Sequence, residues 1–246
     1  MKLSVIIPAY NEEKRLPKTL KSIDEYLKRQ NYPYQIIVVN DGSRDRTSQT
    51  VVNLQKEIAN LKLIDRKINK GKGYSVKEGM LAGQGDYRLF MDADNSTSID
   101  QIEKMWAWFE KGYDVVIGSR DIKGAILDPP QPIHRRIVGR FFKLIRIMIC
   151  DLFKIKDTQC GFKCFTREAT EIIFPKMKMN RFAFDVEILL IAKINGFKIK
   201  EVPVIWKNDP QSKVKLKSAI KMGIDLFKIR FYQLKGFYGK KQREKS

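Results

Sequence analysis

The sequence YRLFMDAD, residues 87–94, places two carboxylates one residue apart directly after a short apolar run. The run predicts a strand over Tyr87–Met91, and the carboxylates of Asp92 and Asp94 then lie in the loop that follows it. In open α/β sheets, ligands bind beyond the carboxyl ends of the strands. Acidic side chains there offer the hard oxygen ligands that Mg²⁺ and Mn²⁺ prefer, and such ions commonly connect a protein to substrate phosphates. The stretch therefore indicates an α/β sheet that carries either a metal site or a solvated acidic turn at this strand end.

Strand and helix patterns alternate on both sides of this stretch, from residue 3 to residue 118. Short apolar runs predict strands at residues 3–7, 36–39, 61–65, 87–91 and 114–117. Helical patterns fill the intervals at about 11–29, 45–58, 71–81 and 99–110, and Asn11 is the expected N-cap of the first helix. This order is typical of a mainly parallel sheet with helices on both faces. The second half of the chain has a less regular pattern.

The charge of the chain is high and local. Its 246 residues are 43% hydrophobic and 31% charged, as in a folded soluble protein, but 48 Lys and Arg against 28 Asp and Glu give a net charge of +20. Residues 134–156 hold seven basic residues against one acid and residues 207–246 hold twelve against three, so these two segments carry 15 of the 20 net charges. Such a field favours an anionic partner, which can be nucleic acid, acidic lipid or a phosphorylated substrate.

Both basic segments contain the pattern of an amphipathic helix, at residues 133–153 and 216–235. In the second, apolar residues recur at 216, 220, 224, 227, 231 and 234, and lysines at 217, 221, 228 and 235 occupy another face. Two interpretations remain open. The apolar stripes can pack on the protein core, as in ordinary surface helices, or both helices can lie in the interface of an anionic membrane with their basic side among the lipid phosphates.

Several classes of protein are excluded by residue usage. The three cysteines contain no CxxC pair, and the single histidine, His134, leaves a zinc site of the Cys/His type without ligands. Reduced thiols of a cytosolic protein are expected. Met1-Lys2 leads directly into a strand-like run, so we expect no signal peptide, and no uncharged apolar stretch is long enough to cross a bilayer. The sequence predicts a cytoplasmic protein that associates peripherally with a membrane and has no transmembrane segment.

Four polar loops follow the predicted strands: PAYNE (8–12), NDGS (40–43), NKGKG (69–73) and DAD (92–94). Each has a simple explanation as a helix cap, a turn or a flexible loop. In a parallel sheet, however, they all meet at the same edge, where ligands bind. That edge then offers an aromatic ring, carboxylates, a lysine and a metal clamp, which are the parts needed to hold a nucleoside diphosphate.

The motifs PAYNEE (8–13), VVNDGS (38–43), NKGKG (69–73) and DAD (92–94), in this order and spacing, resemble the donor half of inverting glycosyltransferases of the GT-A type. Three further motifs, GSR (118–120), DTQCGFK (157–163) and AFDVE (183–187), narrow the resemblance to the polyprenyl-phosphate sugar transferases. The sequence is most similar to the dolichyl-phosphate β-glucosyltransferases, which use UDP-glucose. The resemblance extends from about residue 3 to residue 235, and two of its runs are long and specific: NEEKRLP (11–17), and DTQCGFK (157–163) followed by FTREA (165–169).

The resemblance implies roles for individual residues of this sequence. Those expected around the uracil, the ribose and the donor phosphates are Pro8, Tyr10, Glu12, Val39, Asp41, Lys72, Asp92, Ala93 and Asp94. Asp94 is the expected direct ligand of Mg²⁺ or Mn²⁺, and Lys207 and Lys213 are expected to close over the donor pyrophosphate. The residues expected to face the acceptor phosphate or the sugar are Arg120, Arg135, Arg136, Gln159 and Asp185. Asp185 can instead cap the helix that begins there, and Gln159 can simply brace its loop.

The resemblance also implies an organisation of the chain and two departures from the family. We expect a GT-A domain over residues 1–210, with a nucleotide-sugar half (1–120) and an acceptor half (121–210), followed by a basic amphipathic helix and tail (211–246). Eukaryotic members carry an N-terminal membrane anchor that we do not find here, so membrane attachment would fall to the two basic helices. Asn95 follows the aspartates where the family often has glycine, which leaves the geometry beside the metal open.

The implied reaction is the transfer of glucose from UDP-glucose to a polyprenyl phosphate with inversion, with Asp92, Asp94 and Arg120 as the catalytic residues. A phosphate oxygen is already anionic near neutral pH, so the absence of a catalytic histidine is no objection. The nearest alternative is a mannosyltransferase that uses GDP-mannose. A nucleic-acid-binding function would leave the four loops unexplained. A dinucleotide-dependent oxidoreductase would be expected to have a GxGxxG motif after its first strand, and this sequence has none there.

Overall fold

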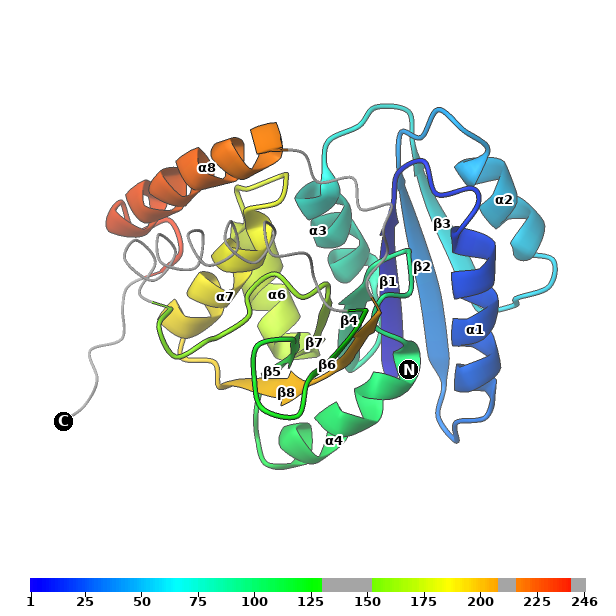
Figure 1. Ribbon diagram of the computed structural model, residues 1–246, viewed down its shortest axis with the longest axis horizontal. Coiled ribbons are helices and arrows are strands. Elements are labelled where there is room, and N and C mark those ends of the chain that lie inside the picture. The colour runs from blue at the N-terminus through cyan, green and yellow to red at the C-terminus, as the bar shows by residue number, and fades with distance from the viewer. Residues whose placement is uncertain (130–151, 208–215, 240–246) are drawn as a thin grey trace.

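The computed structural model describes residues 1–129, 152–207 and 216–239, and it contains one large sheet with helices on both faces (Figure 1). Seven strands form this sheet in the order β3-β2-β1-β4-β7-β5-β8. They are β1 (Leu3–Ala9), β2 (Tyr34–Asp41), β3 (Leu61–Arg66), β4 (Tyr87–Met91), β5 (Val115–Ser119), β7 (Phe162–Thr166) and β8 (Ile199–Pro203). Only β7 runs antiparallel to its neighbours, β4 and β5. The predicted mainly parallel α/β fold is confirmed. A small second sheet pairs β6 (Ile126–Asp128) with β9 (Ile205–Lys207).

Two helix layers cover the sheet because its strands are apolar on both faces. Val5 and Ile7 of β1 belong to one core cluster, and Ile6 between them belongs to the other. The first cluster lies under α1 (Leu16–Lys28), α2 (Thr47–Leu54), η1 (Ile99–Ile102) and α4 (Glu103–Glu110). The second lies under α3 (Lys72–Ala82), α6 (Arg167–Lys176), α7 (Phe184–Ile194) and α8 (Leu216–Leu234).

The order of the strands positions the site. From β1 the chain first adds β2 and β3 on one side, and it then crosses over to add β4 on the other side. Such a reversal leaves a crevice at the carboxyl ends of the two strands on either side of it. The loops that follow β1 and β4 therefore face each other across this crevice.

The first helix begins at Leu16, later than predicted, because Asn11 does not cap it. Asn11 has a φ of 54°, which is the left-handed region, and its backbone N–H donates to Ser43 Oγ at 2.9 Å. Its side-chain Oδ1 accepts from the backbone N–H of Arg44 at 2.8 Å. The N-cap prediction is therefore wrong: Asn11 joins the loop after β1 to the loop after β2.

The helix predicted at residues 216–235 is α8, whereas the one predicted at 133–153 lies outside the described residues apart from its last two positions. In α8, the stripe that includes Ile224, Phe227 and Phe231 faces outward, and these side chains are 56%, 65% and 55% exposed. The interpretation that this stripe packs on the core is therefore wrong. Leu226 and Ile229 form the inward face instead, with no exposed surface. Among the described residues, no helix has the length and hydropathy needed to span a membrane.

Candidate active site

A cavity of about 630 Å³ lies at the carboxyl ends of β1, β2 and β4, next to the start of α3. This volume suits a small-molecule ligand. The predicted site residues that line it are Pro8, Tyr10, Glu12, Asp41, Lys72, Asp92, Ala93, Asp94, Arg120, Gln159 and Asp185. The predicted sheet-edge loops thus contribute to one common cavity.

The other predicted residues lie elsewhere. Val39 has no exposed surface and packs in the core behind the cavity, in the same cluster as Ile6. Lys207 ends β9, and its backbone N–H donates to the carbonyl of Ser96 at 2.7 Å. Three residues, Lys213, Arg135 and Arg136, are outside the described part of the chain.

Asp41, at the end of β2, organises the glycine-rich loop that precedes α3. Its carboxylate accepts from the backbone N–H groups of Lys70 and Gly71, both at 2.8 Å, and from Arg66 Nη2 at 2.6 Å. Gly71 has a φ of 103°, and a Cβ there would lie 2.4 Å from the carbonyl oxygen of Asn180. Glycine is therefore required at this position, since both the backbone conformation and the close contact exclude a side chain.

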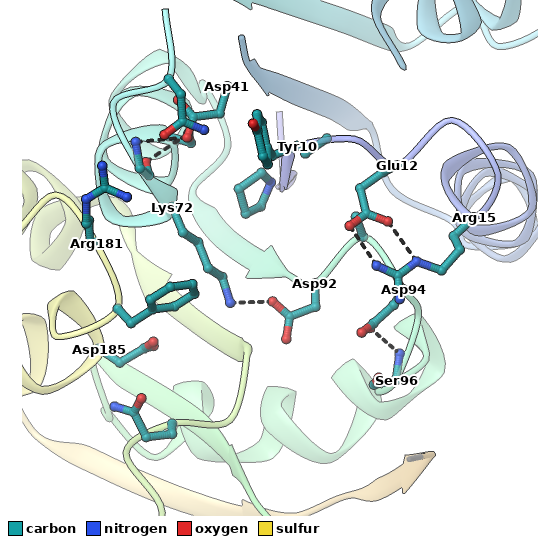
Figure 2. Close-up of a pocket in the computed structure, with 18 of the residues that line it drawn as sticks. Tyr10, Glu12, Arg15, Asp41, Lys72, Asp92, Asp94, Ser96, Arg181 and Asp185 are labelled. Carbon is teal, nitrogen blue, oxygen red and sulfur yellow. Dashed lines mark hydrogen bonds and ion pairs between the residues drawn. The ribbon is translucent and has the colours of Figure 1, made fainter. Parts of the chain in front are cut away.

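Lys72, the first residue of α3, points across the cavity to Asp92, and its Nζ lies 2.6 Å from Asp92 Oδ1 (Figure 2). Burial alone would lower the pKa of Lys72, but the carboxylates of Asp92, Asp185 and Asp94 outweigh it and raise that pKa. The ammonium is therefore held charged inside the cavity. Asp92 is also approached by the backbone of the DTQCGFK motif, where a Cβ on Gly161 would lie only 2.0 Å from Asp92 Oδ2.

Asp94 is the second carboxylate on the loop after β4. It accepts from the backbone N–H of Ser96 at 3.0 Å, and burial together with the charge of Asp92 raises its pKa. Such a pair is poised for a cation, because a positive ion relieves the repulsion between the two carboxylates. Asn95 has a φ of 55°, a left-handed conformation that glycine adopts freely and asparagine tolerates. Asparagine therefore fits the backbone at this position, where the resemblance implies a glycine.

Arg120, which follows β5, is fixed by Asp157. Its Nε and Nη2 donate to the two carboxylate oxygens of Asp157 at 2.7 and 3.0 Å, and its backbone N–H adds a third bond at 3.0 Å. Burial would raise the pKa of Asp157, but Arg120 outweighs it and holds that pKa well below its usual range. The guanidinium also lies 5.4 Å from the ring centroid of Trp206 in β9. This bidentate ion pair fixes the orientation of the Arg120 guanidinium, which stays positively charged, in the wall of the cavity.

A second buried ion pair lies behind the cavity. Lys163 of β7 has no exposed surface, and its Nζ donates to Asp185 Oδ1 and to the carbonyl of Cys160. Asp185 sits in the first turn of α7 and makes this ion pair, and the residue at the N-cap position is Ala183. Gln159 lines the same wall, and within the described part of the chain its buried Nε2 has no hydrogen-bond partner. A buried donor of this kind is suited to a ligand hydroxyl.

Comparison with known proteins identifies the family. Residues 4–174 match the family described as Glycosyl transferase family 2. The chain belongs to this family. It is therefore a glycosyltransferase, as the motifs predicted, and the cavity described above is the candidate active site of a family 2 glycosyltransferase.

Similar proteins cover most of this family 2 chain. Dolichyl-phosphate beta-glucosyltransferase ALG5D of Trichomonas vaginalis is 38% identical over 94% of the chain and 74% of its own length. The dolichyl-phosphate beta-glucosyltransferase of Homo sapiens is 35% identical over 99% of the chain and 79% of its own length. Among solved structures, glucosyl-3-phosphoglycerate synthase from Mycobacterium tuberculosis, in complex with Mn²⁺, UDP and glucosyl-3-phosphoglycerate, has a TM-score of 0.68 and 16% identity over 94% of this chain and 79% of its own. That likeness confirms the fold.

The donor set of the cavity fits a divalent cation that arrives with a phosphate ligand. In the part of the chain that the structure describes, no group of three or more His, Cys, Asp and Glu side chains could hold a metal by itself. Asp92 and Asp94 supply carboxylate oxygens only. Mg²⁺ and Mn²⁺ are usually held in this way, with one or two carboxylates from the protein and the remaining ligands from substrate phosphates and water.

The structure adds cavity residues that the sequence analysis did not single out: Arg15, Ser75, Ser96, Arg181, Phe182 and Trp206. Arg15 forms a two-point ion pair with Glu12, with both N–O distances 2.7 Å, and it lies inside the NEEKRLP stretch that carried much of the resemblance. Arg181 and Trp206 come from loop and edge segments without a distinguishing pattern, so no sequence signal indicated them.

Proposed function

We propose that this family 2 glycosyltransferase transfers glucose from UDP-glucose to a dolichyl-type polyprenyl phosphate with inversion, giving a β-glucosyl phosphoryl-polyprenol. One observation carries the proposal: the carboxylate pair, Lys72 and Arg120 line a single cavity. It is supported by the curated relatives that share 35% and 38% identity with the chain, which are named as dolichyl-phosphate β-glucosyltransferases. We also propose that the protein works as a peripheral protein at an anionic membrane surface.

The donor nucleotide is proposed to enter from the side of β1 and β2. Tyr10, at 38% exposure, offers its ring to the uracil at the cavity mouth, and Glu12 and Asp41 face the ribose. Asp41 is preorganised for this task, because its hydrogen bonds to the glycine-rich loop fix its carboxylate. Gln159 and Asp185 lie at the other wall, where the buried amide nitrogen of Gln159 is a donor for a glucose hydroxyl.

Departure of UDP builds negative charge on the diphosphate, and positive charge placed there in advance lowers the barrier. A bound Mg²⁺ or Mn²⁺, held by Asp94 and Asp92, supplies such charge when it is present. Lys72 is the protein's own contribution. We propose that its ammonium neutralises Asp92 before the donor binds, and that it would face the donor diphosphate if Asp92 and Asp94 held a cation.

The acceptor oxygen is an anion and needs little help from a general base, but it must approach a second anion. Arg120 is suited to relieving this repulsion, because Asp157 holds its guanidinium in one orientation in the cavity wall. Attack from the face opposite the leaving diphosphate inverts the anomeric carbon. Further contacts with the phosphates stay predictions, and they involve Lys207, Lys213, and Arg135 or Arg136.

The test is transfer of radiolabel into the organic phase. The purified protein is incubated with Mn²⁺, dolichyl phosphate and either UDP-glucose or GDP-mannose, each labelled in the sugar. We expect label from UDP-glucose only, and none from the Asp94→Asn variant; Asp100→Asn, an exposed acid six residues further along the chain, is the control that keeps full activity. Label from GDP-mannose would instead favour the mannosyltransferase, and no transfer from either sugar would reject the proposal.

A further inference from the structure

Helix α8 is apolar on two faces. Its inward face contains Leu226 and Ile229, which have no exposed surface and belong to the core cluster beneath α6 and α7. Just beyond the helix, Tyr238 is also fully buried, and its hydroxyl donates to Glu187 Oε1 at 2.6 Å. The carbonyl of Tyr238 accepts from Asn195 Nδ2 at 2.9 Å. These contacts fix the rotation of α8, so its opposite face cannot turn inward.

The outward face of α8 is also apolar. Ile224, Phe227, Phe231 and Leu234 follow one another at intervals of three, four and three residues, which places them on one side of the helix. They are 56%, 65%, 55% and 71% exposed. A single exposed apolar residue needs no explanation, but a row of four large ones on one helix face marks an interaction surface.

Basic side chains border this row on both sides. Lys221, Lys228 and Lys235 recur every seven residues, which places them along one edge, and Arg230 lies on the other edge. All four residues are exposed. The surface therefore consists of an apolar centre with a cationic rim.

We propose that this face of α8 docks into an anionic lipid bilayer, with the two phenylalanines, Ile224 and Leu234 among the acyl chains and the basic rim at the level of the lipid phosphates. The pattern of apolar side chains flanked by Lys and Arg is what binding in the plane of a bilayer interface requires. The inference reverses the expectation that the basic side of this helix faces the membrane. It rests on the proposed function in one respect: a lipid-borne acceptor makes the bilayer the expected occupant.

The charges on the rim argue against the other occupants. A second copy of the chain docked through the same face would bring two cationic rims together, and each chain carries a net charge of +20. Nucleic acid would match the rim but would leave the apolar centre facing phosphates. Of these three occupants, an anionic bilayer is the one that satisfies both parts of the surface.

The experiment is flotation of the full chain with vesicles of phosphatidylcholine alone or mixed with phosphatidylglycerol. Neither UDP-glucose nor transfer is needed, so its failure is distinguishable from failure of the proposed function. The wild-type protein should float with the anionic vesicles. Phe227→Gln/Phe231→Gln should weaken this binding by about tenfold or more for each phenylalanine lost from the apolar layer. Lys221→Glu/Lys228→Glu/Lys235→Glu should weaken it by at least roughly fivefold for each lysine replaced, and only with anionic vesicles.

The matched control is Val52→Gln on α2, an apolar residue with 42% exposure on a different helix, which should bind vesicles like the wild type. Circular dichroism and UDP affinity should be unchanged in the phenylalanine variant, because both side chains are more than half exposed and neither lines the cavity. Unaltered flotation of that variant would overturn the proposal. So would a wild-type dimer that the phenylalanine substitutions dissociate, since the occupant would then be a second copy.

Discussion

The hydroxyl of Tyr238 should contribute measurably to folding stability through Glu187. Glu187 lies in α7 with no exposed surface, and besides Tyr238 it accepts from the backbone N–H groups of Lys178 and Met179, both at 2.9 Å. A hydrogen bond to a buried carboxylate contributes about 1.5–3 kcal/mol, and its removal leaves the charge less compensated. Tyr238→Phe should therefore lower the free energy of unfolding by about 1.5–3 kcal/mol. Urea denaturation followed by circular dichroism measures this difference.

The chain contains a matched control. Tyr26 donates to Glu103 at 2.6 Å, the same donor, acceptor and distance, but that pair is exposed. Water replaces an exposed hydrogen bond at little net cost, so Tyr26→Phe should change the free energy of unfolding by no more than about 0.5 kcal/mol. If the two variants lost the same stability, burial would not be the reason for the contribution of Tyr238.

The pH dependence of the Tyr238→Phe effect gives an independent check. Burial raises the pKa of Glu187 above its ordinary value of 4.5, although the hydrogen bonds from Tyr238 and the two backbone groups offset part of the shift. Glu187 therefore contributes stability that is fully present below pH 4.5 and is lost as the pH rises through its folded-state pKa. The Tyr238 bond favours the ionised form, so its removal should cost most above that pKa and less below it. A cost that is independent of pH would refute the reasoning.

Three further predictions concern the site. Gly161→Ala should lower the rate of glucose transfer at least tenfold by displacing Asp92, whereas Gly223→Ala, where a Cβ meets nothing within 4 Å, should leave the rate unchanged; equal rates would show that the contact is tolerated. Lys163→Met should lower the free energy of unfolding, measured by urea denaturation, by about 3–5 kcal/mol, because it leaves the charge of Asp185 buried without its partner. The double variant Lys163→Met/Asp185→Leu should recover much of that loss, and additive effects of the two substitutions would contradict the prediction. Removal of divalent cations with EDTA should abolish transfer, and added Mn²⁺ should restore it. Transfer that persists after dialysis against EDTA would contradict the need for a cation.

The alternation of apolar runs and helical patterns predicted most of the sheet, because buried parallel strands have a pattern that depends on local sequence. It did not predict β7, which inserts antiparallel between β4 and β5. That pairing joins residues 87–91 to residues 162–166, and no local pattern records a contact over such a separation. The seven-residue strand β1 and the eight-residue β2 also extend beyond their predicted ends, to Ala9 and Asp41, which line the cavity.

The cavity could be predicted as far as its residues immediately follow strands. Asp41, Asp92 and Asp94 were found in this way, since the direction of a parallel strand fixes where its carboxyl end lies. Arg181 depends instead on the path of the loop before α7, which is held by backbone contacts with the glycine-rich loop. Lys163 left one unused signal. A lysine inside the otherwise apolar β7 run FKCFT must either lie at a sheet edge, where its ammonium reaches water, or form an ion pair. Because β7 lies in the middle of the sheet, the lysine must form an ion pair.

The outward face of α8 shows why periodicity alone could not settle the role of this helix. Apolar residues at 224, 227, 231 and 234 form one stripe, and those at 222, 226 and 229 form another. Either stripe satisfies the helical period, so the sequence gives no reason to bury one rather than the other. The choice is made by Tyr238, four residues beyond the helix, whose hydroxyl reaches Glu187 only when the second stripe faces the core. The first stripe is then left on the surface by the same contact that stabilises the fold, and loss of the Tyr238 anchor should weaken vesicle binding as well as stability.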